Sequence, residues 1–118
     1  MRLLPMALIS LLVLVLISPT GCSPDPGPPD LVGIVESVSF LDDGGATLLV
    51  EGDPDAGYQY YLASVRVGRD TPVYLTDGSR GTPEDLTTGL TLKIWFDGPV
   101  AESWPVQAQA GRIEISEP

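Results

Sequence analysis

The chain has 118 residues, the length of a single domain, with 6 basic and 16 acidic side chains, one cysteine and no histidine. The lack of histidine excludes catalytic and metal-binding mechanisms that need an imidazole, and the single cysteine excludes an internal disulfide and a multi-cysteine metal site. The formal net charge of -10 argues against electrostatic binding of nucleic acid, because that binding needs a basic face.

An apolar segment follows the first two residues of the chain. Residues 3–17 are interrupted only by Pro5 and Ser10. This run is shorter than the ~20 residues that a membrane-spanning helix needs. A short charged start and an apolar core are typical of an export signal, and a transmembrane anchor is the weaker alternative.

The apolar run ends in Ser18-Pro19-Thr20-Gly21-Cys22, which resembles the lipobox of bacterial lipoproteins. The resemblance implies cleavage before Cys22, attachment of a diacylglycerol to its thiol and acylation of the new N-terminus. Pro19 departs from that family, which usually has an aliphatic residue there. The alternative is an ordinary secretory signal that leaves Cys22 as a free thiol. We expect a signal peptide at residues 1–21 and a palmitate-bearing lipoprotein on the extracytoplasmic side of the bacterial cell membrane or envelope.

A proline-rich segment follows the cysteine, with four prolines in residues 23–30. Proline lacks an N–H and fixes φ, so this segment is neither helix nor central strand. In the polyproline II conformation it would form a semi-rigid spacer of roughly 25 Å. We therefore expect the lipidated cysteine and spacer to occupy residues 22–30 and the folded domain to occupy residues 31–118.

Alternating apolar residues predict strands in residues 31–40, 46–51 and 60–67. Glu36 interrupts the first alternation, which indicates a bulge or an edge position. Asp42-Asp43-Gly44-Gly45 predicts a tight hairpin between the first two strands. The side chains expected to face the core are Val32, Ile34, Val38 and Phe40 in the first strand, Ala46, Leu48 and Val50 in the second, and Tyr61, Ala63, Val65 and Val67 in the third.

The second half of the domain predicts a short strand at residues 71–75, a clear strand at 90–96 and a last strand near the C-terminus. The side chains expected inside are Leu90, Leu92, Ile94 and Phe96, followed by Ile113 and Ile115. Only residues 82–86 have a helical pattern, because Thr82 suits an N-cap, Pro83 suits the first helical position and acidic residues follow.

Five or six short strands, with one helical turn before the penultimate strand, predict an all-β fold. The order strand-strand-strand-helix-strand-strand is that of an OB-fold, so we expect a small OB-like β-barrel. Closure would also hide the strand edges of a chain that has few edge charges. A small sandwich is the alternative.

The second half of the chain also carries a recognisable set of motifs. They comprise Gly89, Trp95 and Gly98, the segment Glu102-Ser103-Trp104-Pro105, and Gln107, Ala108, Ile113 and Ile115. This pattern resembles the YobA-like family of small exported bacterial proteins, a domain of unknown function. The resemblance implies an OB-like fold and an envelope location, and it supplies no catalytic residues.

The candidate ligand face lies on or around the loop between the last two strands: Trp95, Asp97, Glu102, Ser103, Trp104 and Gln107. In OB-folds this loop flanks the ligand face, and exposed indoles can stack on a sugar or base ring. The alternative is that Trp104 and Pro105 cap the barrel end as a structural plug. A binding module should expose a clustered aromatic face, whereas a structural protein should bury Trp104.

We expect the protein not to be an enzyme and to need no cofactor or metal. Lys93 is the only lysine, and the acidic turns at residues 42–43 and 53–55 lack the regular pattern of a calcium loop. The expected function is that of a membrane-tethered, non-catalytic binding or interaction module. Its expected partner, besides the membrane, is an envelope protein or a neutral glycan and not nucleic acid. The alternative is a structural or stress-related envelope protein without a small ligand.

Overall fold

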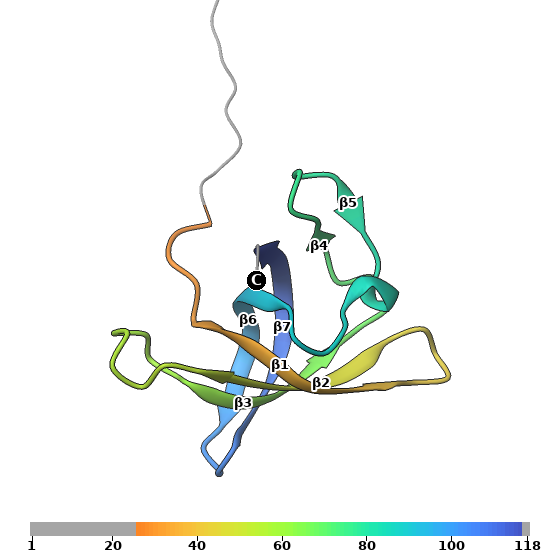
Figure 1. Cartoon of the computed structure of the whole chain (residues 1–118). Coiled ribbons are helices and arrows are strands. Elements are labelled where there is room, and N and C mark those ends of the chain that lie inside the picture. Colours follow the sequence, from red (N-terminus) through yellow and green to blue (C-terminus); the bar gives the residue numbers. More distant parts are fainter. Residues whose placement is uncertain (1–25, 117–118) are drawn as a thin grey trace, which may run out of the picture.

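The computed structural model describes residues 26–116, so Cys22 and the expected signal peptide at 1–21 lie outside the described residues (Figure 1). The strands are β1 (Leu31–Phe40), β2 (Ala46–Gly52), β3 (Leu62–Val67), β4 (Val73–Tyr74), β5 (Arg80–Gly81), β6 (Thr91–Ala101) and β7 (Val106–Ser116), with a 3-10 turn, η3 (Pro83–Asp85), before β6. Across residues 26–116, no helix has the length and apolar character needed to cross a membrane.

Five of the strands form a closed barrel. β1, β2 and β3 make an antiparallel meander, β1 also pairs with β6, and β6 pairs with β7. The barrel closes where β7 returns to β3 in parallel, from Ala63 opposite Val106 to Arg66 opposite Gln109. The predicted small all-β barrel with a helical turn before its penultimate strand is confirmed.

The prediction did not include β5. β4 pairs in parallel with β7 at Ile113 and Glu114, beyond the part of β7 that pairs with β3, and β5 pairs with β4 to make a small hairpin. The turn between them is closed by Asp77, whose carboxylate accepts hydrogen bonds from the Ser79 N–H at 2.9 Å and the Ser79 hydroxyl at 2.7 Å. These bonds lower the pKa of Asp77. β4 and β5 therefore extend the sheet outside the closed barrel.

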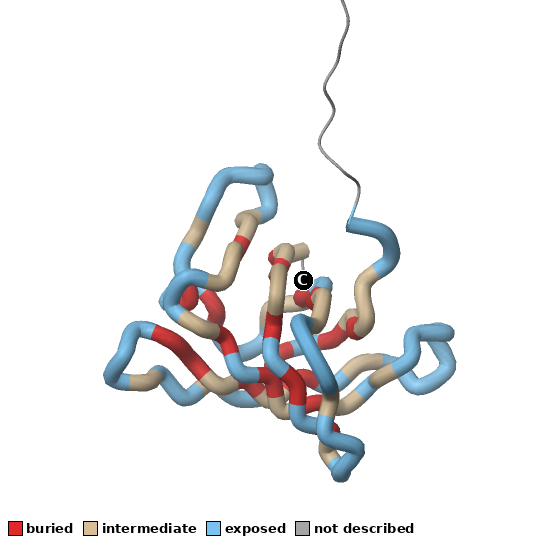
Figure 2. Tube along the Cα trace, turned by 180° about the vertical axis from the view of Figure 1, so that it is seen from behind, coloured by how far each residue is buried: buried red, intermediate tan, exposed pale blue. Residues whose placement is uncertain are grey.

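The core is apolar and is built from all five barrel strands, with the loops exposed around it (Figure 2). The predicted inner faces of β2, β6 and β7 are confirmed, with Phe96 half-buried at the margin of the core. Tyr61 stands before β3 and is 36% exposed, so its predicted place inside is wrong. The fully buried members with the largest side chains are Leu31, Leu48, Leu86, Leu92, Ile94 and Ile113.

The predicted inner face of β1 is wrong in its first half. Leu31 and Val35 are buried, whereas Ile34 is 48% exposed. The expected bulge at Glu36 is present as a register shift between Val35 and Ser37. A bulge adds one residue and reverses which parity faces the core, so the alternation read from Val38 does not extend back to Ile34. Phe40, at the end of the strand beside the hairpin, is also exposed.

The second half of the expected spacer lies along β6. The Trp95 indole Nε1 donates to the Gly27 carbonyl at 3.0 Å, and the Asp30 N–H donates to the Ile94 carbonyl at 2.9 Å. The Phe96 N–H, beside a register shift between β6 and β7, donates to the Asp30 carboxylate at 2.8 Å. Within the described residues, the N-terminal segment is thus hydrogen-bonded to β6 from Gly27 onward, four residues before β1.

Candidate functional site

Trp104 lies in the loop between β6 and β7 and is 64% exposed. Its ring meets that of Tyr61 in an edge-to-face pair, with 5.2 Å between centroids and 63° between planes. The closure of the barrel explains this pair, because β3 and β7 run in parallel from Ala63 and Val106. The residues just before each strand therefore lie side by side, although they are distant in sequence.

The loop around Trp104 is folded on itself by its own hydrogen bonds. The Ser103 hydroxyl donates to the Pro105 carbonyl at 2.8 Å, and the Ser103 N–H donates to the Ala101 carbonyl at 2.8 Å. Ser103 thus shapes the loop that carries Trp104. The exposure of Trp104 does not fit the plug alternative, in which this side chain would be buried over the barrel end.

Glu102 connects the same loop to the loop between β2 and β3. Its carboxylate accepts a hydrogen bond from the Tyr60 hydroxyl at 3.4 Å, and the Gln59 amide donates to the same hydroxyl at 3.2 Å. The Tyr60 ring packs against Phe96, with 5.5 Å between centroids. Partial burial, followed by the negative charge of Glu102, the hydrogen bond to it and the charge of Asp30, raises the pKa of Tyr60.

We call this surface the aromatic end and define it by five residues: Tyr58, Tyr60, Tyr61, Glu102 and Trp104. Its tyrosines were not recognised as site residues in the sequence. The available signal was the run Tyr58-Gln59-Tyr60-Tyr61, where three aromatic residues lie within four positions of a loop.

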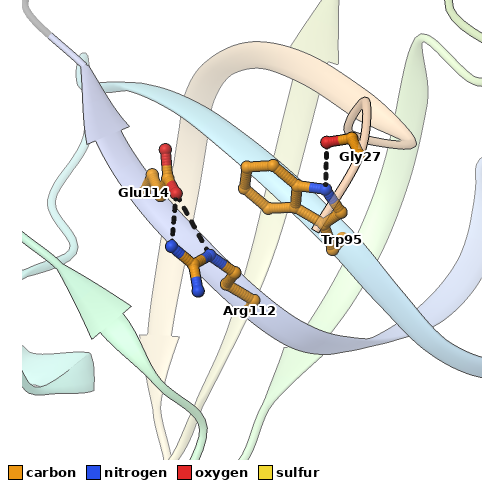
Figure 3. Close-up of polar contacts among 4 residues, drawn as sticks. All are labelled: Gly27, Trp95, Arg112 and Glu114. Atoms are coloured by element: carbon orange, nitrogen blue, oxygen red, sulfur yellow. Dashed lines mark hydrogen bonds and ion pairs between the residues drawn. The ribbon is translucent and has the colours of Figure 1, made fainter. Parts of the chain in front are cut away.

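Trp95 lies apart from Trp104. It pairs with Arg112 along β6 and β7, whereas the loop that carries Trp104 begins only after Ala101. Its indole donates to the Gly27 carbonyl, and the Arg112 guanidinium lies over its ring at 5.5 Å from the centroid (Figure 3). Trp95 thus joins the N-terminal segment to the barrel, and the two indoles do not form one face.

A groove of about 740 Å³ is lined in part by Arg112 and by Tyr74, Lys93 and Glu114. Arg112 donates to the Glu114 carboxylate from Nε at 3.1 Å and from Nη2 at 2.7 Å (Figure 3). The guanidinium also lies over the Tyr74 ring, 4.4 Å from its centroid. Glu114 and Tyr74 already contact the Arg112 guanidinium, so this charged group is less available to a ligand. The groove is therefore a weaker candidate for ligand binding than the aromatic end.

The remaining predicted site residues are dispersed. Asp97 is exposed on β6 and lines a shallow hollow with Arg69, while Gln107 is exposed on β7 and lines another with Arg66. Of the six predicted residues, the structure brings together Glu102, Ser103 and Trp104, and it leaves Trp95, Asp97 and Gln107 outside the aromatic end.

Residues 26–116 contain no group of three or more carboxylate or other ligating side chains that could hold a metal ion.

No family model matches the chain, and neither a curated protein nor a solved structure shows significant similarity to it. Membership of the YobA-like family therefore stays a prediction from the motifs in residues 89–115.

Proposed function

We propose that the protein is a membrane-tethered envelope lipoprotein whose barrel acts as a non-catalytic interaction module, with the aromatic end as its contact surface. The observation that carries this proposal is the exposed pair of Tyr61 and Trp104. Tyrosine and tryptophan are enriched at the centres of protein interfaces, because they bury a large apolar area when a partner covers them. An isolated domain gains little by leaving a tryptophan in water.

The strand arrangement supports an OB-like classification of the barrel. The strand order β3-β2-β1-β6-β7, closed by the β3–β7 pairing, and the turn η3 before β6 match the expected order of an OB-fold. In OB-folds the loop between the last two barrel strands contributes to ligand binding. Trp104 and Glu102 lie in this loop.

The position of the chain entry supports a tethered module. Residues 26–30, orange in Figure 1, enter at the opposite end of the molecule from the tip of the β6–β7 hairpin, and Figure 2 shows the same separation. Cys22 precedes Gly27 by five residues. That stretch spans at most about 18 Å when fully extended. A lipid on Cys22 would keep the entry side near the bilayer and leave the loop between β6 and β7, which carries Trp104, pointing away from it.

We expect Cys22 to carry the lipid. Radiolabelled palmitate should label the wild-type chain and sediment with membranes, whereas the Cys22→Ser chain should carry no label and be released from the membrane fraction. A Pro19→Leu variant, which restores the usual lipobox residue, should be labelled at least as well as wild type. Equal labelling of the wild type and Cys22→Ser would exclude this anchor.

We expect the aromatic end to touch its partner in living cells. A photoactivatable benzophenone side chain would be placed at Gln59, in the loop of the aromatic end, or at Thr76, in the exposed turn between β4 and β5. Irradiation should give an adduct of discrete higher mass from position 59 and none from position 76. Adducts from both positions, or from neither, would favour the structural alternative.

A further inference from the structure

We propose that the group recognised by the aromatic end is a cationic side chain, a lysine ammonium or an arginine guanidinium, on a segment of a partner protein. This inference rests on the proposed function, because it assumes that the aromatic end is the contact surface. It adds the chemical class of the group that the surface selects.

The charges of the two loops supply the first argument. Residues 53–61 contain Asp53 and Asp55, residues 98–105 contain Glu102, and neither loop contains a lysine or an arginine. A surface that carries one sign of charge attracts ligands of the opposite sign and repels phosphates, carboxylates and acidic polymers.

The state of Glu102 supplies the second argument. In the described part of the chain the ion pairs are Arg66 with Asp43 at 3.7 Å and Arg112 with Glu114 at 2.7 Å, so Glu102 has no ion-pair partner there. A carboxylate can accept about four hydrogen bonds, and Glu102 accepts one, from the Tyr60 hydroxyl. Glu102 therefore keeps acceptor capacity for a cationic donor.

Tyr60 fixes the place of this carboxylate. Its hydroxyl lies between the Gln59 amide and Glu102, and its ring is held against Phe96. A tyrosine hydroxyl with the ordinary pKa near 10 is protonated at neutral pH, and the pKa of Tyr60 is raised further, so this hydroxyl can donate to Glu102. The carboxylate is thus held by Tyr60, in the same loop as Trp104, before a partner arrives.

The ring geometry supplies the third argument. The planes of Tyr61 and Trp104 meet at 63°, so the pair forms a corner and not a flat platform. A sugar stacks on one open ring face, whereas a cation is bound well by several aromatic walls and a nearby carboxylate. Glu102 lies two residues before Trp104 in the same loop. This combination favours an ammonium or guanidinium group over a neutral glycan.

The test uses the full lipidated chain in a neutral detergent, with the two indole N–H signals followed by heteronuclear NMR. The probes are the peptide acetyl-Gly-Lys-Lys-Gly-amide and the same peptide with both lysines acetylated. We expect the lysine peptide to shift the Trp104 signal saturably and the acetylated peptide to bind on the order of tenfold more weakly. The Trp95 signal, whose N–H is bonded to Gly27, serves as an internal reference.

Matched charge variants separate a specific site from the general negative charge of the protein. Glu102→Gln and Glu84→Gln each remove one negative charge, and Glu84 is exposed on η3. Glu102→Gln should weaken binding of the lysine peptide about fivefold by removing a contact carboxylate, whereas Glu84→Gln should leave it nearly unchanged. Equal weakening by the two variants would overturn the proposed site.

Two further results would also overturn the inference. The first is equal binding of the lysine peptide and the acetylated peptide. The second is a shift of the Trp104 signal by neutral chitotriose when the lysine peptide causes no such shift. If either result occurs while crosslinking from position 59 persists, the interaction module stands and its cationic ligand is wrong. If position 59 gives no crosslink as well, both proposals fall.

Discussion

Replacing Ile94 by alanine is expected to lower the free energy of unfolding by about 2–5 kcal/mol. Ile94 is fully buried and lies opposite Leu31 on β1 and Ile113 on β7, where three strands of the barrel meet. Its truncation removes apolar contacts and leaves a cavity that the closed barrel cannot easily collapse. For a domain of ordinary stability, this loss is a large share of the total.

Lys93→Ala is the matched control for Ile94→Ala, because Lys93 is the adjacent residue of β6 and is exposed. A surface change of this kind should cost well under about 1 kcal/mol. Urea unfolding followed by circular dichroism measures both variants. If the two variants lost similar free energies of unfolding, the assignment of Ile94 to the inner face of β6 and of Lys93 to its outer face would be wrong.

Gly33→Ala is expected to cost about 2–3 kcal/mol or more, through overpacking between two strands. Gly33 lies directly opposite Gly52 in the β1–β2 register. A Cβ on Gly33 would come within 2.7 Å of the carbonyl carbon and oxygen of Glu51, and a Cβ on Gly52 would meet the Val32 carbonyl oxygen. Because these contacts are with backbone, no side chain can move aside to relieve them.

Gly68→Ala controls for the general effect of adding a methyl group at a glycine. The added Cβ would meet only the Thr71 hydroxyl, at 3.4 Å, so the loss should stay below about 1 kcal/mol. The same unfolding measurement compares the two variants. A Gly33→Ala protein as stable as Gly68→Ala would contradict the close approach of β1 and β2.

Local patterns predicted the parts of the fold that depend on neighbours in sequence. The hairpin at residues 42–45 follows from its glycines, and Gly44 has a φ of +92°, which other residues rarely adopt. The inner faces of β2, β6 and β7 follow from alternation alone. The first half of β1 could not be predicted in this way, because the bulge between Val35 and Ser37 reverses the alternation within one strand.

The candidate site depends on contacts between residues that are distant in sequence, and no local sequence pattern predicts such contacts. Tyr61 fits the alternation of β3, so its pairing with Trp104 emerges only when β3 and β7 close the barrel. Trp95 was grouped with Trp104 because both lie near the same loop in sequence. Its bond to Gly27, 68 residues earlier, instead makes it part of the barrel's contact with the N-terminal segment.

The central claim is that Trp104 forms the contact surface of a tethered module. Its most direct test repeats the crosslinking from position 59 in living cells with Trp104→Ala, using Lys93→Ala as the control on a different strand face. Trp104 is mostly exposed, so its truncation should leave folding intact. We predict that Trp104→Ala reduces the adduct at least about fivefold, as expected for loss of an aromatic anchor, and that Lys93→Ala leaves it unchanged. An undiminished adduct in a folded Trp104→Ala protein would contradict the account.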